Sequence, residues 1–279
     1  MNKQKTIDKS ASVVKPIKKT IIITGASAGI GKAAARELPR DNRVVIVGRS
    51  AQTVTVAKEL GLEYFRADYS DLASVRKLAK DLLKACPSID LLVNNAGGIM
   101  KSIITTKDGF EQTFQVNYLA QFLLTNLLMD QIVESKGAII NTSSAAHRFS
   151  HLDRTALQSA GSPFAAYSNA KLLDLLHAQE LARRYSAKGV DVVSFHPGVV
   201  ATNFASETNG PFAWMYKTAM NTLLKTPAQG ADTLVWLANN RKLWQNGGYY
   251  SNRKLSPVSG IAKDPTTSPA IWDITTALL

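Results

Sequence analysis

The chain has 279 residues, of which 45% are hydrophobic and 19% charged, a composition typical of a globular protein with a sizeable core. Lys and Arg outnumber Asp and Glu by 33 to 21, giving a net charge of +12, but the positive charge is spread along the chain and no nucleic-acid-binding motif accompanies it, which argues against nucleic-acid binding. The single cysteine, Cys86, excludes an intramolecular disulfide and a Cys-rich metal site, and it fits a reducing, cytoplasmic compartment.

Residues 1–18 are polar and basic, and we expect them to form a flexible lead-in. They lack the uninterrupted apolar core of a signal peptide. The most apolar helical run, Tyr118 to Leu128, is too short to cross a bilayer and contains polar side chains. The sequence therefore predicts no integral membrane span.

The first half of the chain alternates between short apolar runs and amphipathic runs. Gly61 is expected to close the second helix and Asp71 to cap the third. The predicted strands are 20–24, 43–48, 63–67 and 89–95. The predicted helices are 29–39, ended by a proline, 51–60 and 71–85.

The second half continues the alternation. Long helices are predicted at 108–134 and 163–188, and strands at 137–144, 190–198 and 247–250. Strands that alternate with helices predict βαβ units and a parallel sheet. We expect an α/β fold in a single domain, residues 19–279, with a doubly wound sheet of about seven strands and helices on both faces.

The run TGASAGIG, from Thr24 to Gly31, joins the first predicted strand to the first helix. Gly25 would permit the tight turn, Gly29 a close approach of the backbone to a pyrophosphate, and Gly31 close packing of the helix. The helix N-terminus would then face the phosphates with free N–H groups. We expect Ser27, Ala28 and Ile30, in the same turn, to contact the cofactor as well.

Five further motifs follow in order, and with the glycine turn they cover nearly the whole chain. They are NNAG at 94–97, an asparagine at 117 inside a helix, NTSS at 141–144, YSNAK at 167–171 and HPGVVAT at 196–202. On these motifs the chain resembles the short-chain dehydrogenases/reductases, in their compact single-domain branch with a Rossmann-type fold. The runs QVNYLAQFLLT, NTSSAAH and GGYYSN resemble the retinol-dehydrogenase-like and protochlorophyllide-reductase-like subgroup.

The second predicted strand ends in Gly48, Arg49 and Ser50, where an acidic residue would hydrogen-bond an unphosphorylated ribose. No carboxylate stands there, and Arg49 can pair with a 2′-phosphate, with Lys32 as a second nearby charge. NADP(H) is therefore favoured over NAD(H). The resemblance implies that further residues contact the cofactor: Asp68, Tyr69, Asn95, Ala96, Gly97, Pro197, Gly198, Val200 and Thr202. Asn94 is expected to tie the central strands together instead.

Tyr167 and Lys171 are four residues apart, so on a helix their side chains share one face. A free tyrosine has a pKa of about 10, and an adjacent ammonium favours its phenolate. The resemblance implies that Tyr167 passes a proton to or from the substrate oxygen and that Lys171 also bonds the nicotinamide ribose. It further implies that Ser144 holds the substrate oxygen and that Asn117 holds a water linked to the lysine. Ser143 is the less favoured serine.

Two segments are expected to wall the substrate pocket, 145–166 and 203–226, the second through apolar residues such as Phe204, Phe212 and Trp214. The same apolar residues could instead pack helices. His196 is expected to be structural, and His147 and His151 lie near the site in sequence. No cluster has the spacing of a metal site.

The predicted function is an NADP(H)-dependent oxidoreductase that interconverts an alcohol and a carbonyl of a bulky lipophilic substrate. A sugar-nucleotide epimerase or dehydratase could use the same Tyr–Lys pair, but the glycine spacing and the short C-terminal part argue against it. A non-catalytic sensor of nicotinamide redox state would not need all four of Asn117, Ser144, Tyr167 and Lys171. The helices at 108–134 and 163–188 predict a homodimer or homotetramer, although their apolar residues could equally be monomer core.

Overall fold

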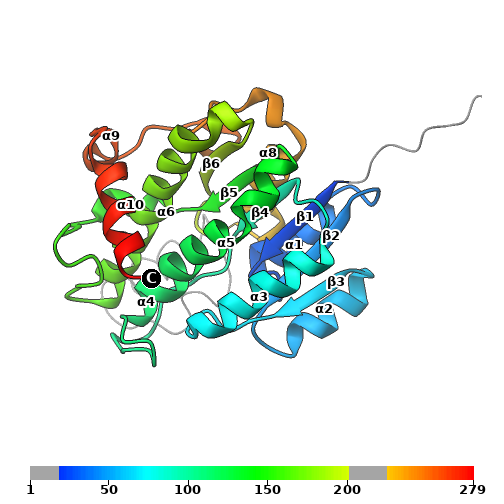
Figure 1. Ribbon diagram of the computed structural model, residues 1–279, viewed down its shortest axis with the longest axis horizontal. Helices are drawn as coiled ribbons and strands as arrows, with labels where there is room; N and C mark the ends of the chain where they lie inside the picture. Colours follow the sequence, from blue (N-terminus) through cyan, green and yellow to red (C-terminus); the bar gives the residue numbers. More distant parts are fainter. Residues whose placement is uncertain (1–18, 201–224) are drawn as a thin grey trace, which may run out of the picture.

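An eight-stranded sheet forms the centre of the protein (Figure 1). The structure is a computed structural model that describes residues 19–200 and 225–279. The strands are β1 Thr20–Thr24, β2 Arg43–Gly48, β3 Glu63–Arg66, β4 Leu91–Asn94, β5 Ala138–Thr142, β6 Asp191–His196, β7 Tyr249–Ser251 and β8 Lys254–Leu255. Their order is β3-β2-β1-β4-β5-β6-β7-β8, so the direction of winding reverses between β1 and β4, where α/β sheets bind ligands.

All seven predicted strands are present, and every neighbouring pair is parallel except the last. The unpredicted β8 is a two-residue edge strand paired antiparallel to β7. Asn252 and Arg253 form the turn between them with φ of 50° and 62°. Two residues are too few to show a strand period, which is why the sequence pattern misses β8.

Alternate residues of each strand enter different cores, because successive side chains point to opposite faces of a sheet. Ile22, Leu92 and Ile139 pack with helices α3 Leu72–Ala85, α5 Ala120–Glu134 and α6 Pro163–Tyr185. Their strand neighbours Ile21 and Ile140 pack with α1 Gly29–Glu37, α2 Gln52–Leu60 and α8 Pro227–Asn239. Burial on both faces explains why the strands read as continuous apolar runs.

Several helix ends follow directly from local sequence. Gly61 ends α2 in the left-handed region with φ of 67°. The Asp71 carboxylate accepts from the Ala73 N–H at 3.0 Å and caps α3. The 3-10 turn η3 Ser186–Lys188 extends α6 to Gly189, whose φ is 82°. The predictions for Gly61, Asp71 and the end of the long helix at Lys188 are confirmed.

The helix predicted at 108–134 is wrong in its first turn and in its regularity. Helical structure begins with α4 Gln112–Phe114, passes through a π-helical segment η1 Gln115–Leu119, and continues as α5. The Asp108 carboxylate accepts from the Leu72 N–H at 2.9 Å and the Gln115 side chain at 2.7 Å, so it belongs to the preceding loop. Glu111 is the cap, accepting from the N–H groups of Thr113 and Phe114.

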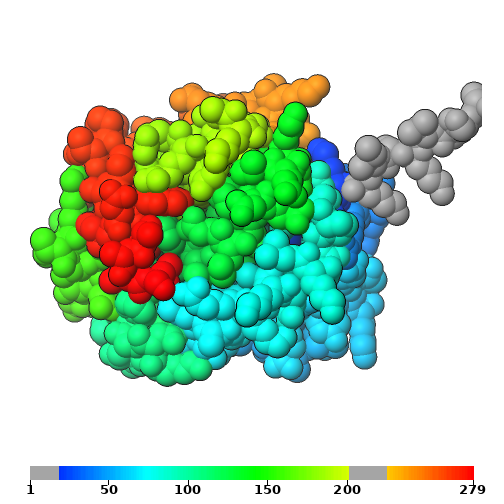
Figure 2. Space-filling view, viewed as in Figure 1, coloured from blue at the N-terminus to red at the C-terminus, as the bar shows by residue number. Residues whose placement is uncertain are grey.

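The C-terminal helix α10 Thr267–Ala277, preceded by the short α9 Gly260–Lys263, lies along α6 (Figure 1). Trp272 packs on Phe122 of α5 with ring centroids 4.9 Å apart, and the Arg184 guanidinium lies 4.5 Å from its ring centroid. In the space-filling view the red C-terminal segment lies on the left of this face, beside green segments (Figure 2). Within 19–200 and 225–279, no helix has the length and apolar character needed to cross a membrane.

Candidate active site

The glycine turn connects β1 to α1 with no room for larger side chains. Gly25 and Gly29 have φ of 67° and 56°. A Cβ on Gly25 would lie 2.6 Å from the Ala96 Cα, and one on Gly31 would lie 2.6 Å from the Gly25 carbonyl oxygen. Ala28 precedes α1 and provides no side-chain cap, and the first turn of α1 holds no acidic residue. The backbone N–H groups of that first turn therefore stay open to an anion.

The loop after β4 is fastened to this turn by one hydroxyl. Thr24 Oγ1 accepts from the N–H groups of Asn95 and Ala96 at 2.9 and 3.0 Å, and donates to the Val93 carbonyl at 3.2 Å. The Asn95 side chain donates to the Thr24 carbonyl at 2.9 Å. The two loops that would flank a dinucleotide are therefore one unit. Asn94 instead donates to Asn141 of β5 at 3.0 Å, as expected of a residue that ties central strands.

The π-helical segment holds the next residues of the same loop. Asn117 is fully buried; its side-chain oxygen accepts from the Gly98 N–H and its amide donates to the Gly98 carbonyl, both at 2.9 Å. Gln121 donates to the Ala96 carbonyl at 2.5 Å and to the Asn117 carbonyl at 2.6 Å. A Cβ on Gly97 would collide with Asn117 Oδ1. π-Helical turns of this kind are frequent at functional sites.

The two serines after β5 face different ways. Ser143 is buried and donates to the Lys171 carbonyl at 2.6 Å, so it fastens β5 to α6. Ser144 lines a large cavity. Its hydroxyl has one recorded contact, accepting from the Ala146 N–H at 3.2 Å in the first turn of η2 Ala145–Phe149. The hydroxyl proton of Ser144 can therefore be directed at a ligand.

Two histidines near Ser144 hydrogen-bond the backbone around it. His147 is buried; Nδ1 lies 2.7 Å from the Ser144 carbonyl and Nε2 accepts from the Ser259 N–H. Burial lowers its pKa. His196 accepts from the Ala145 N–H, and burial lowers its pKa to about 4. His196 also lines the cavity, so its structural role stays a prediction, whereas His151 is exposed and does not line the cavity.

Tyr167 and Lys171 lie on one face of α6, as their spacing predicts. Both are buried, and the Lys171 ammonium is 5.6 Å from the centre of the Tyr167 ring. The ammonium donates to the Thr142 carbonyl at 2.9 Å and to the Asp174 carboxylate at 2.8 Å. Helix α6 is positioned at its start by Ser162, which accepts from the Ala165 N–H.

Arg49 lies at the end of β2, exposed at the far part of the cavity. Its carbonyl accepts from the guanidinium of Arg66 on β3, which brings a second positive charge to this corner. Lys32 is instead paired with Glu59 at 2.7 Å, which corrects its expected contribution to this corner. Asp68 lines the cavity and accepts from the Ser70 hydroxyl at 2.7 Å. Tyr69 is buried next to Asp68, and this burial raises the pKa of the Tyr69 hydroxyl.

The loop after β6 forms the end of the cavity opposite Arg49. Pro197, Gly198 and Val200 all line the cavity. Gly198 has φ of 90° and lies against the Lys225 side chain, whose backbone N–H donates to the Val199 carbonyl. Thr202 and the apolar segment expected to wall the substrate pocket lie outside the described residues.

One cavity of about 1040 Å³ joins these features. It runs from the glycine turn past Arg49 and Asp68 to Ser144, Tyr167 and Lys171. Every predicted site residue within the described ranges lines it except Gly31 and Asn117, which lie behind the wall. An open helix N-terminus, a glycine cradle and a basic corner fit a phosphorylated dinucleotide.

Only the two ends of the segment 145–166 reach the cavity. Phe149 and Phe164 line its mouth with ring centroids 6.1 Å apart. The middle packs elsewhere: Leu157 is buried in the core under α6, and Arg154 pairs with Asp264 at 3.2 Å. In the described part of the chain, no group of His, Cys, Asp and Glu has the arrangement of a metal site.

Three residues that matter to this geometry were not predicted. Thr24 and Gln121 are ordinary polar residues whose partners come from distant segments. The role of Asp174 could have been predicted from the sequence. It is an acidic residue three positions after Lys171, so it lies on the same helix face in an otherwise apolar run.

The chain is similar to known proteins over most of its length. A family model described as short chain dehydrogenase matches residues 19–211. A Streptomyces protein named "Putative daunorubicin C-13 ketoreductase DnrU" is 41% identical over 274 residues, 93% of this chain and 92% of that protein. Human retinol dehydrogenase 11 is 35% identical, over 94% of this chain and 86% of that protein. Among solved structures, an uncharacterized protein from Mycobacterium paratuberculosis aligns with a TM-score of 0.75 and 28% identity, covering 93% of this chain and 92% of that one.

Proposed function

The chain belongs to the short-chain dehydrogenase family, in its retinol-dehydrogenase-like subgroup, and on this premise we propose that it uses NADP(H) to interconvert an alcohol and a carbonyl of a bulky lipophilic substrate. Membership makes it an oxidoreductase that acts on alcohol or ketone substrates. The observation that carries the finer proposal is the convergence of Ser144, Tyr167 and Lys171 on the cavity that begins at the glycine turn.

In this proposal the nicotinamide, when bound, supplies the hydride for carbonyl reduction or accepts it in alcohol oxidation. Tyr167 gives its phenolic proton to the carbonyl oxygen during reduction and takes the proton back during oxidation. The Ser144 hydroxyl donates a hydrogen bond to the same oxygen, where negative charge develops. Lys171 stabilises the phenolate that remains on Tyr167.

In the proposed reaction the π-helical segment acts indirectly, by holding the backbone beside Lys171. Asn117 and Gln121 hold the backbone from Ala96 to Gly98 beside Lys171. The water relay expected for Asn117 stays a prediction. Its backbone carbonyl, the group that would accept from such a water, also accepts from the Gln121 side chain.

The preference for NADP(H) is supported by charge at the end of β2. Arg49 and Arg66 are adjacent there, and neither has a recorded ion pair within the described residues. A guanidinium pairs well with a phosphate, whereas an unphosphorylated ribose is usually held by a carboxylate at the end of the second strand, where this chain has Gly48, Arg49 and Ser50.

A lipophilic substrate is supported by the apolar mouth of the cavity. Phe149 is 63% exposed and Val199 44%, and both line the cavity with Phe164 and Met100. Exposed apolar side chains at a cavity rim mark a binding surface. Relatives named as a ketoreductase and retinol dehydrogenases are consistent with such substrates.

The testing experiment is a screen of NADPH oxidation over aliphatic, aromatic, retinoid-like and steroid-like carbonyls, repeated with NADH. We expect turnover with NADPH on the bulky apolar carbonyls and weaker turnover with NADH. Tight NADPH binding without turnover on any carbonyl would favour the redox-sensing alternative. Conversion of a sugar nucleotide without net NADPH oxidation, followed in a parallel assay of the product, would favour the epimerase alternative.

Two further proposals concern the whole protein. A cytoplasmic location is supported by the free, buried thiol of Cys86 and is tested by cell fractionation. A homodimer or homotetramer through α5 and α6 is tested by sedimentation velocity. Because α10 covers part of that face in the same chain, pairing would have to use what α10 leaves exposed.

A further inference from the structure

The Lys171 ammonium has a buried acidic partner that the proposed reaction does not use. The side chains of Lys171 and Asp174 are 5% and 1% exposed, and their charged atoms lie 2.8 Å apart. The pair stands on α6, one turn beyond Tyr167. A buried carboxylate is costly unless a specific interaction requires it.

The surroundings fix this pair in position. Two of the three ammonium N–H groups are used by the Asp174 carboxylate and the Thr142 carbonyl, which leaves one for the cavity. The Asp174 backbone carbonyl accepts from the Asn141 side chain at 3.1 Å, and the Lys171 carbonyl accepts from Ser143. Strand β5 therefore holds the backbone of both residues.

The charged neighbours of Asp174 are few. Lys171 is the charged partner on its own helix, and Tyr118 of η1 is the titratable group that faces it from the neighbouring segment. Tyr118 is buried and shares a hydrogen bond with Thr275 of α10 at 2.8 Å, so it stays neutral. Burial raises the pKa of Asp174 to about 6, and Lys171 opposes that rise, so the carboxylate is ionised near neutral pH.

We propose that Asp174 is a positioning residue: it anchors the Lys171 ammonium and offsets part of its positive charge, so that Tyr167 stays protonated and acts as a proton donor near neutral pH. The inference rests on the proposed function. An unopposed ammonium 5.6 Å from the ring centre would favour the phenolate more strongly. A carboxylate on the far side of that ammonium reduces the effect without touching the substrate.

The variant that tests the charge is Asp174→Asn, which keeps the shape and one acceptor oxygen. We expect the pH midpoint of alcohol oxidation to fall by about one unit, at the low end of the shifts produced by a neighbouring charge. The rate of carbonyl reduction should decline at a lower pH than in the wild type. Asp174→Glu keeps the charge and should keep a midpoint close to the wild-type value.

The matched control is Glu180→Gln. Glu180 is a buried carboxylate on the same helix, paired with Arg183 and Arg184 and away from the cavity. Its loss should lower stability and leave the pH midpoint unchanged. If Asp174→Asn behaves like Glu180→Gln, Asp174 is a structural residue only and the proposal is overturned.

A second measurement needs neither cofactor nor substrate. The tyrosinate absorbance at alkaline pH is recorded for the protein with and without Tyr167→Phe, and the difference isolates Tyr167. The same pair is measured in the Asp174→Asn background, where we expect that difference signal to appear about one pH unit lower. An unmoved signal contradicts the proposal even if the enzyme turns over. Absence of turnover in the wild type would count against the proposed function alone.

Discussion

At the scale of single residues, the site depends on side chains that hold other groups in place. Thr24 Oγ1 uses its donor and both acceptor positions to join β1 to the loop after β4. Ser143 and Ser144 are adjacent just after β5, yet the Ser143 hydroxyl donates to the α6 backbone, whereas the Ser144 hydroxyl accepts from the Ala146 N–H at the edge of the cavity. The preference for Ser144 as the serine of the site stays a prediction, which this difference supports.

The proposed preference for NADP(H) depends most on Arg49, the arginine that lines the cavity, and predicts a selective effect. Arg49→Ala should weaken NADPH binding tenfold to a hundredfold, since a hydrogen bond to a charged group contributes about 1.5–3 kcal/mol. NADH binding should change less than threefold, because no phosphate contact is lost. Fluorescence titration of both cofactors measures the two constants.

The control for Arg49 is Arg36→Ala. Arg36 is an exposed arginine on α1 that contacts Glu59 and does not line the cavity. It should leave both cofactor affinities unchanged. Equal weakening of NADPH and NADH binding in Arg49→Ala would show that the side chain acts on the fold of the turn and not on a phosphate.

At the scale of elements, the sequence predicts regular structure well where local chemistry decides it. Gly61, Asp71 and Gly189 end or begin helices for reasons visible in the sequence. The π-helical turn at 115–119 is not visible in the same way. It accompanies the side chains of Asn117 and Gln121, which take backbone carbonyls that regular helix would use, and their other partners are distant in sequence.

Helices α5, α6 and α10 meet around a buried histidine. His177 lies with its ring centroid 4.9 Å from that of Phe122 and 5.9 Å from that of Trp272, and its Nε2 atom has no recorded partner. Burial lowers its pKa to about 3, against an ordinary value of 6.5. The neutral imidazole is therefore part of this helix contact.

This predicts an acid-sensitive contact. The folded-state pKa of His177 is depressed, so its stabilising contribution is complete above pH 6.5 and is lost as the pH falls toward 3, because the unfolded chain takes up a proton that the folded chain excludes. Between pH 7.5 and pH 5 the loss should be about 2 kcal/mol. His177→Leu should remove this part of the pH dependence.

Urea unfolding of the wild type and His177→Leu at both pH values measures the effect. The difference between the two proteins cancels the titration of all other groups, including Asp174. The same pH dependence in both proteins would show that His177 is protonated in the folded state and would contradict the burial argument.

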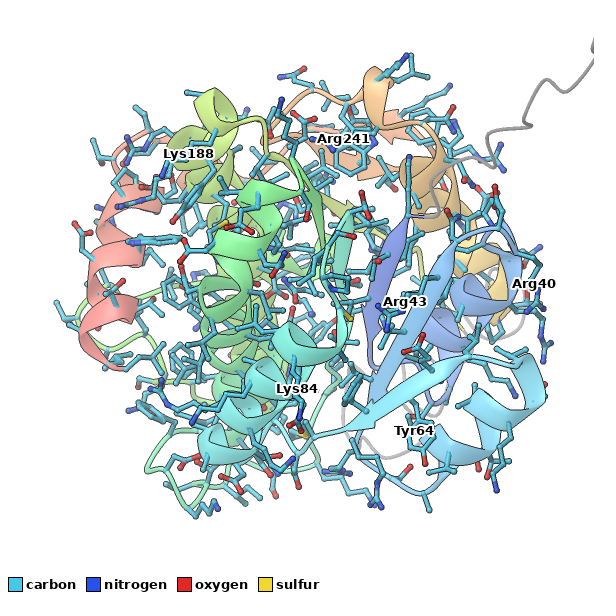
Figure 3. The ribbon with its side chains drawn as sticks, turned by 45° about the vertical axis from the view of Figure 1, so that its right-hand side comes forward. Arg40, Arg43, Tyr64, Lys84, Lys188 and Arg241 are labelled. Atoms are coloured by element: carbon cyan, nitrogen blue, oxygen red, sulfur yellow. The ribbon has the colours of Figure 1, made fainter. Side chains whose placement is uncertain are left out.

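At the scale of the whole molecule, basic residues have different roles at the two ends of the sheet. At the carboxyl end Arg49 lines the cavity, and Arg66 lies beside it with its guanidinium on the Arg49 carbonyl. At the amino end Arg43 pairs with Glu63, and Arg241 bonds the Gly189 carbonyl and the Asp191 carboxylate; both arginines are labelled in Figure 3. The sequence shows that positive charge is dispersed; which charges bind neighbouring segments depends on the folded chain.

Arg241 is the clearest example of a charge used for stability. It donates to the carbonyls of Lys136 and Gly189 at 2.6 and 2.9 Å and to the Asp191 carboxylate at 2.7 Å, and so joins the entries to β5 and β6. Arg241→Ala should cost about 1–2 kcal/mol of unfolding free energy, less than for fully buried bonds because the side chain is partly exposed. Lys188→Ala should cost under about 0.5 kcal/mol.

Chemical denaturation of both variants tests this difference. An Arg241→Ala variant as stable as Lys188→Ala would mean that solvent replaces all three hydrogen bonds without loss of stability.

The apolar sequence of segment 203–226 predicts a wall of the substrate pocket. What such a segment packs against depends on distant parts of the chain, so the sequence of the segment alone does not determine it.

The proposed function depends most on Tyr167, which exchanges the proton with the substrate oxygen while the rest of the site binds the cofactor. Its most direct test measures NADPH oxidation by the wild type and by Tyr167→Phe on one carbonyl taken from the screen, with NADPH binding titrated in parallel. We predict that Tyr167→Phe binds NADPH within threefold of the wild type and loses at least about a hundredfold in kcat, the contribution of a positioned proton donor. A variant that keeps turnover within tenfold of the wild type would contradict the claim.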